Sequence, residues 1–162
     1  MLKNVTVIIL ATAVLIFSLL PLCSCTQATD ASALMREFCS AYGVSPTVYS
    51  PMVREGEEGY VKEDFFFSLY GEEPYAVRDF ALVLLSDLDS IFECGVFVCY
   101  NDYDALTVSD MLERRIELIR EVAASSGLKY PKDAFVMREN RCVVMAVLPD
   151  AERARRIWKR II

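Results

Sequence analysis

The chain has 162 residues, of which 54% are hydrophobic and 25% are charged, a size and composition that suit one globular domain with a targeting segment. Its formal net charge of −6 repels phosphate backbones, so we expect no nucleic-acid partner. Histidine is absent, and with it the side chain most used for proton transfer near neutral pH and as a neutral metal ligand. We therefore expect a protein that is not an enzyme and that uses no cofactor or metal.

The N-terminal residues 1–24 are typical of a secretory signal peptide. Lys3 is their one charged side chain, residues 5–20 form an apolar run, and Pro21 interrupts the helix before small residues. The following motif, Leu-Cys-Ser-Cys ending at Cys25, resembles the signal of bacterial lipoproteins, in which this cysteine is acylated and the chain is cleaved before it. The resemblance implies that Cys25 carries the lipid, such as palmitate.

A lipidated Cys25 would hold the rest of the chain at the outer face of the cell membrane, because two acyl chains are enough for stable anchoring. Two alternatives stay open. Residues 5–22 are just long enough to remain as an uncleaved membrane-spanning helix, or the chain is cleaved and freely secreted. Residues 25–30 are polar and lack periodicity, which predicts a tether, and residues 31–162 then form one domain.

The domain begins with two predicted helices. Residues 31–42 place apolar side chains at helical spacing between Asp30, a suitable N-cap, and Gly43, a suitable stop. Residues 44–62 are rich in proline and glycine and predict irregular structure. A second short helix is expected over residues 63–70, closed by a glycine.

Aromatic and acidic side chains are concentrated between residues 57 and 75. Aromatic rings give contact area at little cost in conformational entropy, so this stretch could form a carbohydrate- or peptide-binding surface. The alternative, favoured because aromatic side chains are mostly buried, is that the rings cover the sheet. The candidate residues for such a surface are Tyr60, Phe66, Tyr70 and Tyr75.

The rest of the chain predicts the order strand, strand, helix twice. Apolar runs over residues 80–85 and 91–100 flank a Ser- and Asp-rich turn, and an amphipathic helix follows from about Thr107, its expected cap, to residue 125. A second strand pair, 134–138 and 142–148, leads to a last helix capped by Asp150. This ββαββα order predicts an α+β fold, with one four-stranded antiparallel sheet and helices packed on one face.

Two acidic clusters are candidate cation or catalytic sites, because hard cations and acid–base pairs both need several carboxylate oxygens. Asp87 and Asp89 lie in the turn of the first hairpin, whereas Asn101, Asp102 and Asp104 lie beyond its open end, roughly 30 Å away at about 3.3 Å per strand residue. The second cluster also lacks the glycine and distal glutamate of an EF-hand loop. We therefore interpret both clusters as turn-forming and helix-capping residues.

Four cysteines follow the leader: Cys39, Cys94, Cys99 and Cys142. Cys94 and Cys99 are five positions apart on one strand and so face opposite sides of the sheet, while Cys142 could pair with either if its strand is adjacent. Their apolar neighbours favour free buried thiols. The last helix also carries a run of basic residues, 153–160, which could contact anionic lipid headgroups or simply face solvent.

The segments LYGEEPY, FECGVFVCYNDYDALTVSDMLERRIELI and AFVMRENRCVVMAVLPDAERARRIWKRI resemble a family of small exported lipoproteins of Gram-positive bacteria, over residues 63–162. The family has no established activity, so the resemblance implies a cell-envelope location and no catalytic residues. The sequence thus predicts a membrane-tethered, non-enzymatic domain that contacts an unidentified envelope protein. The alternatives are a lipoprotein that binds a small ligand or glycan through the aromatic residues above and, with no acid pair to support it, a hydrolase that uses carboxylates alone.

Overall fold

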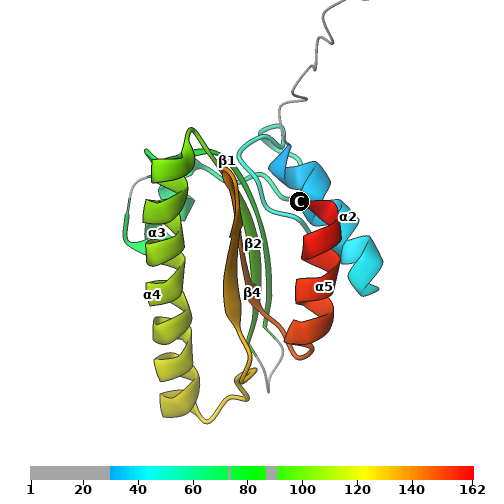
Figure 1. Cartoon of the computed structure of the whole chain (residues 1–162), viewed down its shortest axis with the longest axis vertical. Helices are drawn as coiled ribbons and strands as arrows, with labels where there is room; N and C mark the ends of the chain where they lie inside the picture. The colour runs from blue at the N-terminus through cyan, green and yellow to red at the C-terminus, as the bar shows by residue number, and fades with distance from the viewer. Residues whose placement is uncertain (1–29, 73, 87–90) are drawn as a thin grey trace, which may run out of the picture.

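The computed structural model describes residues 30–72, 74–86 and 91–162; the predicted signal peptide, Cys25, Asp87 and Asp89 lie outside these ranges. Four strands form an antiparallel sheet in the spatial order β1-β2-β4-β3, which confirms the predicted α+β class (Figure 1). The elements in chain order are α2 (Ala31–Tyr42), α3 (Glu63–Tyr70), β1 (Val77–Ser86), β2 (Ile91–Cys99), α4 (Asp102–Ser126), β3 (Phe135–Glu139), β4 (Cys142–Val147) and α5 (Ala151–Ile161).

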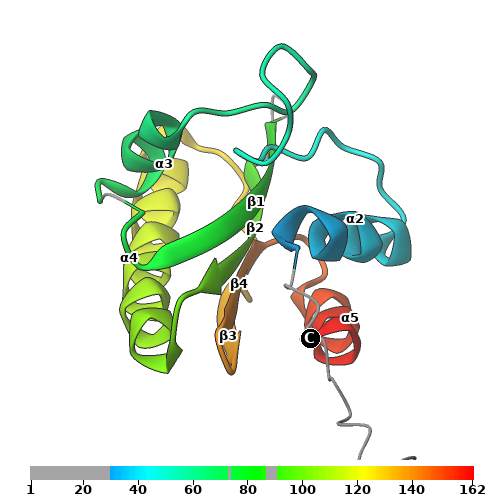
Figure 2. The ribbon, with the colours of Figure 1, turned by 90° about the horizontal axis from the view of Figure 1, so that it is seen from above.

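Helices cover both faces of the sheet, with α2 and α5 on one side and α3 and α4 on the other (Figure 2). The prediction that the helices pack on one face is therefore wrong. The reason is visible in the strands, because β1, β2 and β4 are apolar at consecutive positions and present apolar side chains to both faces. A sheet of this kind needs a layer on each side to exclude water from both faces.

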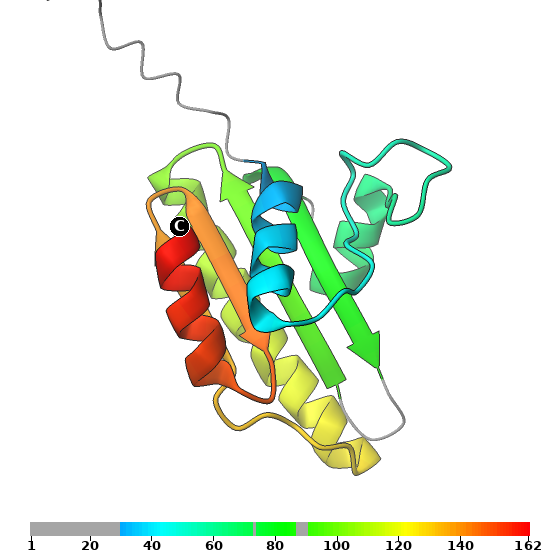
Figure 3. The same ribbon diagram turned by 90° about the vertical axis from the view of Figure 1, so that its right-hand side faces the viewer.

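On the first face, α2 and α5 lie side by side across the sheet (Figure 3). Phe38 of α2 stacks on Trp158 of α5, with ring centroids 4.5 Å apart and ring planes 5° apart, and both side chains are completely buried. Alternate residues of β2, Cys94, Val96 and Val98, belong to the same cluster. This stack joins the two helices to each other and to the sheet.

On the second face, α3 and α4 cover the sheet. The ring of Phe66, from α3, is centred 5.2 Å from that of Phe80 and 6.1 Å from that of Phe97. Gly95 of β2 leaves room for this cluster, because a Cβ atom at Gly95 would lie 2.6 Å from Cε2 of Phe97 and 2.9 Å from Cδ2 of Leu82. The small residue is thus required by close packing against an aromatic ring.

The predicted N-caps of α2 and α5 are confirmed, whereas the predicted start of α4 is wrong. The Asp30 carboxylate accepts hydrogen bonds from two backbone N–H groups of α2, and the Asp150 carboxylate accepts one from the Arg153 N–H of α5. α4 begins at Asp102 and not near Thr107, because the Asn101 side chain accepts a hydrogen bond from the Asp104 N–H at 2.9 Å. An asparagine directly after the strand is therefore the effective N-cap.

Candidate functional site

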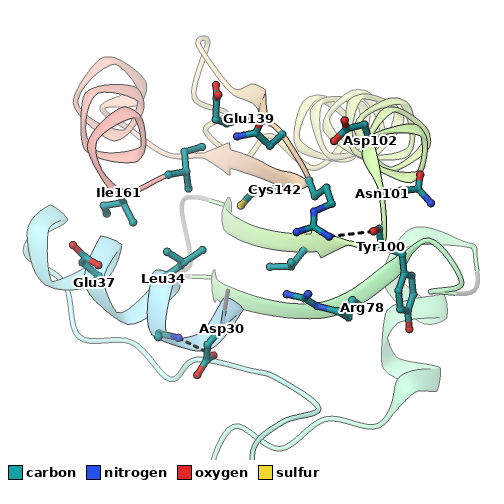
Figure 4. A pocket seen from close by; sticks show the side chains of 15 residues that line it. Asp30, Leu34, Glu37, Arg78, Tyr100, Asn101, Asp102, Glu139, Cys142 and Ile161 are labelled. Atoms are coloured by element: carbon teal, nitrogen blue, oxygen red, sulfur yellow. Dashed lines mark hydrogen bonds between the residues drawn. The ribbon is translucent and has the colours of Figure 1, made fainter. Parts of the chain in front are cut away.

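A cleft of about 1190 Å³ opens at one end of the sheet, between the first turns of α2 and the last turn of α5 (Figure 4). Val98 and Cys142, which are partners across the β2–β4 pair, lie among its lining residues. Leu34 and Ile161 line it from the two helices. The cleft is thus built on the α2–α5 face, at the end of the sheet where β2 finishes and β4 begins.

Charged side chains of both signs line this cleft. Arg78 comes from β1 and Arg141 from the turn between β3 and β4, whereas the acids come from α2 and its N-cap, from α4 and from β3. Arg141 lines the cleft, and its guanidinium donates a hydrogen bond to the Tyr100 carbonyl oxygen at 3.5 Å. Such a lining can pair with both the cationic and the anionic groups of one ligand. The charged lining residues are Asp30, Glu37, Arg78, Asp102, Glu139 and Arg141.

A buried carboxylate beside the cleft positions α2. Oδ2 of Asp79, on β1, accepts a hydrogen bond from the Ala31 N–H at 2.8 Å, so it fastens the first residue of the helix to the sheet. Asp79 is 7% exposed, and its Oδ1 has no hydrogen-bond partner among the described residues. Burial raises the pKa of Asp79, and the hydrogen bond from Ala31 offsets part of that rise. The helical wall of the cleft depends on this contact.

Among the described cysteines, Cys142 is the one that lines the cleft, and it is not suited to be a nucleophile. Burial raises its pKa to about 12, so the thiol is protonated at neutral pH. All four cysteines of the described part are free, and burial also raises the pKa of Cys39 to about 11 and that of Cys99 to about 12. Cys94 and Cys99 face opposite sides of the sheet, as predicted.

The four predicted aromatic surface residues do not come together on one surface. Phe66 is completely buried, and its ring packs 4.7 Å from that of Tyr70, which is half-buried. Tyr75 is 84% exposed, and Tyr60 is half-buried in the loop before α3, where it forms an isolated bridge with Ser50. Two of the four rings therefore belong to the packing under α3, as the alternative interpretation had them.

The second acidic cluster acts as a helix cap. Asn101 and Asp104 hydrogen-bond to each other through both their side chains and the Asp104 N–H, while Asp102 lies in the first turn of α4. Acids in the first turn stabilise a helix through its dipole. Within residues 30–72, 74–86 and 91–162, no group of three or more Cys, Asp or Glu side chains is arranged to hold a metal ion.

Sequence reasoning missed a buried ion pair on the α3–α4 face. Arg115 of α4 donates three hydrogen bonds to Glu93 of β2, from Nη2 to Oε2 at 2.7 Å and from Nε to Oε1 at 3.1 Å and to Oε2 at 3.3 Å. The Tyr70 hydroxyl lies 3.4 Å from Oε1, and burial, followed by the negative charge of Glu93, raises the pKa of Tyr70. The signal in the sequence was one acid inside an otherwise apolar strand, which needs a cationic partner.

Comparison of the chain with protein-family models, with curated proteins and with solved structures finds no match. Within the described part of the chain, no helix has the length and apolar character required to cross a membrane.

Proposed function

We propose that the chain is an exported lipoprotein, anchored by Cys25 at the outer face of the cell membrane, whose folded part binds a segment of another envelope protein without catalysis. The leader sequence supports the anchor, through its apolar run and the Leu-Cys-Ser-Cys motif. The observation that carries the binding role is the cleft at the end of the sheet. It is the feature of the described residues that combines size, apolar contacts and charge.

The size and lining of the cleft favour a polypeptide segment over a small molecule. Pockets for small ligands hold about 300–1,000 Å³ and are mostly apolar with a few polar groups. This cleft, of about 1190 Å³, is larger, and it combines acids with Arg78 and Arg141. A peptide segment offers both charges and apolar side chains, so it can match such a lining along its length.

The chemistry of the cleft supports binding and not catalysis. Cys142 is kept protonated by burial, and the chain contains no histidine to activate it or any hydroxyl nucleophile. The carboxylate of Asp30 is already engaged as the N-cap of α2. An activity assay is therefore a weaker test than a measurement of binding.

Anchoring is tested by mass spectrometry of the mature N-terminus, purified from membranes of cells that express the full chain. We expect a chain that begins at a diacylated Cys25, and a Cys25→Ala variant that is neither acylated nor cleaved there. Cys23→Ala is the matched control and should be acylated as the parent is. If the membrane fraction held an unacylated chain that retains Met1, the anchor would be an uncleaved helix and not a lipid. If the same unacylated chain were found in the cell interior, the proposal that the protein is exported would be overturned.

Binding in the cleft is tested with a photo-crosslinking amino acid placed at Glu37, which is exposed and lines the cleft. The same substitution at Glu113, which is exposed on α4 and away from the cleft, is the control. We expect one protein adduct of defined mass from position 37, absent from position 113 and weakened at least tenfold by Arg141→Glu. Equal adducts from both positions, or an adduct that Arg141→Glu leaves unchanged, would contradict the assignment of the cleft.

A further inference from the structure

The positive charge of this acidic chain is concentrated on α5. The helix holds five basic side chains and one acidic one; without them, the 17 basic and 23 acidic side chains of the chain become 12 and 22. The rest of the protein is therefore strongly negative, while one helix is strongly positive. The charged residues of α5 are Glu152, Arg153, Arg155, Arg156, Lys159 and Arg160.

Two of these cations are used inside the fold. The Arg153 guanidinium lies 5.1 Å from the ring centroid of Tyr42, and that of Arg155 lies 4.3 Å from the ring centroid of Phe135. Such contacts between a cation and an aromatic face stabilise the packing of a helix on its neighbours. They account for the positions of these two side chains without any external partner.

The other three cations have no such role. The side chains of Arg156, Lys159 and Arg160 are exposed and make no hydrogen bond or ion pair with any residue in the described part of the chain. They line a groove of about 480 Å³ between α5 and the end of α2, together with Ala41, Arg153 and Ile157. The described residues that line the groove include four cationic side chains and no acid, so the groove favours an anion with several oxygens, such as a phosphate ester.

We infer that this groove binds the headgroups of anionic phospholipids at the membrane surface and thereby holds the α2–α5 layer against the bilayer. The inference rests on the proposed lipid anchor, which would keep α2 close to the membrane because α2 directly follows the predicted tether. A membrane meets one face of a protein, whereas a nucleic acid would also meet the acidic remainder of this chain. Charge complementarity therefore favours a lipid surface.

The test uses the full chain in nanodiscs of phosphatidylcholine alone, or of phosphatidylcholine with anionic phosphatidylglycerol. The headgroup of phosphatidylcholine carries a photoreactive probe in the first discs, and that of phosphatidylglycerol carries it in the second. Mass spectrometry then locates the lipid adducts. We expect adducts on α5 in the anionic discs, and their loss in the variant Arg156→Gln/Lys159→Gln/Arg160→Gln. Each cation near an anionic surface strengthens binding about fivefold, so the docking equilibrium should weaken about 100-fold.

A matched variant, Arg54→Gln/Lys129→Gln/Lys132→Gln, loses the same charge from exposed positions that do not line the groove and should keep the α5 adducts. Equal thermal unfolding temperatures would show that both variants are folded. Adducts that both variants lose equally, or that appear equally with phosphatidylcholine probes, would overturn the inference. So would their removal by free glycerol phosphate, which would assign the groove to a soluble phosphate ester.

The outcome for the anchor is separable. A chain that enters phosphatidylcholine discs but gives no α5 adducts in anionic ones retains the anchor and overturns the headgroup site. If the chain enters only anionic discs, and no longer enters them when the three α5 cations are replaced, the proposed lipid anchor is wrong and the headgroup site is supported. A chain that enters neither overturns both.

Discussion

The Glu93 carboxylate of β2 and the Arg115 guanidinium of α4 form a bidentate ion pair between the sheet and its covering helix, with side chains 3% and 18% exposed. The two residues are 22 positions apart in the sequence, and their pairing fixes α4 over β2. A charge this far from water is stable only while its partner is present.

Removing one member of this ion pair should therefore lower the stability of the fold. We expect Glu93→Ala to lower the free energy of unfolding by about 3 kcal/mol, because it leaves the Arg115 guanidinium without its counterion in a largely dry site. The double variant Glu93→Leu/Arg115→Met should lose much less, since both charges are removed together. Urea unfolding followed by circular dichroism measures both. A double variant as unstable as the single one would contradict this account.

The buried Asp79 should make stability depend on pH. Folding raises its pKa, so between the ordinary value for aspartate and the raised value the folded state keeps a proton that the unfolded state has lost. The contribution of Asp79 to stability is therefore highest at low pH, where its carboxyl is protonated in both the folded and the unfolded state. This contribution falls as pH rises through the window between the two pKa values. Because asparagine does not titrate, we expect the stability of Asp79→Asn relative to the parent to increase as pH is raised from 3 to 7. Urea unfolding across this range is the measurement, and a constant difference would argue against it.

Gly95 should not tolerate a side chain. A Cβ atom added at Gly95 would lie 2.6 Å from Cε2 of Phe97. We therefore expect Gly95→Ala to lower the free energy of unfolding by about 1–3 kcal/mol through overpacking. Phe97→Leu removes the ring that would clash. The two substitutions together should then cost about 1 kcal/mol less than the sum of their separate effects. Thermal and urea unfolding test this, and strict additivity would exclude the proposed clash.

The start of α4 gives a direct comparison between two candidate caps. Asn101→Ala should cost about 1 kcal/mol, because the Asp104 N–H loses its acceptor. Thr107→Ala should change stability by less than about 0.5 kcal/mol, since its hydroxyl makes one long contact, 3.4 Å, to the Tyr103 carbonyl oxygen inside the helix. Equal losses in chemical unfolding would restore Thr107 as a cap.

Local signals predicted much of this fold. Asp30 and Gly43 marked the two ends of α2 correctly, and the second predicted strand pair is present as β3 and β4. Periodicity could not decide how many faces of the sheet are covered. The apolar runs of β2 and β4, interrupted only by Glu93 of β2, contained that information, because a strand with water on one side alternates in polarity.

The candidate site was much less predictable. Its lining comes from the starts of α2 and β1, the β2–α4 connection, the β3–β4 turn and the end of α5, segments that only tertiary packing brings together. The aromatic stretch was conspicuous in composition, yet Phe66 was needed to fill the space under α3. Residue type indicated burial there, and spacing along the chain could not separate a core ring from a binding ring.

The hydrogen bond from the Ala31 N–H to Asp79 also has a mechanical consequence. Tension applied to the chain ahead of Asp30 would reach the domain at this bond and at the first turn of α2, which packs on β1. The load would then pull α2 away from the sheet before it could shear the paired strands. We therefore expect α2 to be the element that yields first under force, and the four-stranded sheet behind it to be spared.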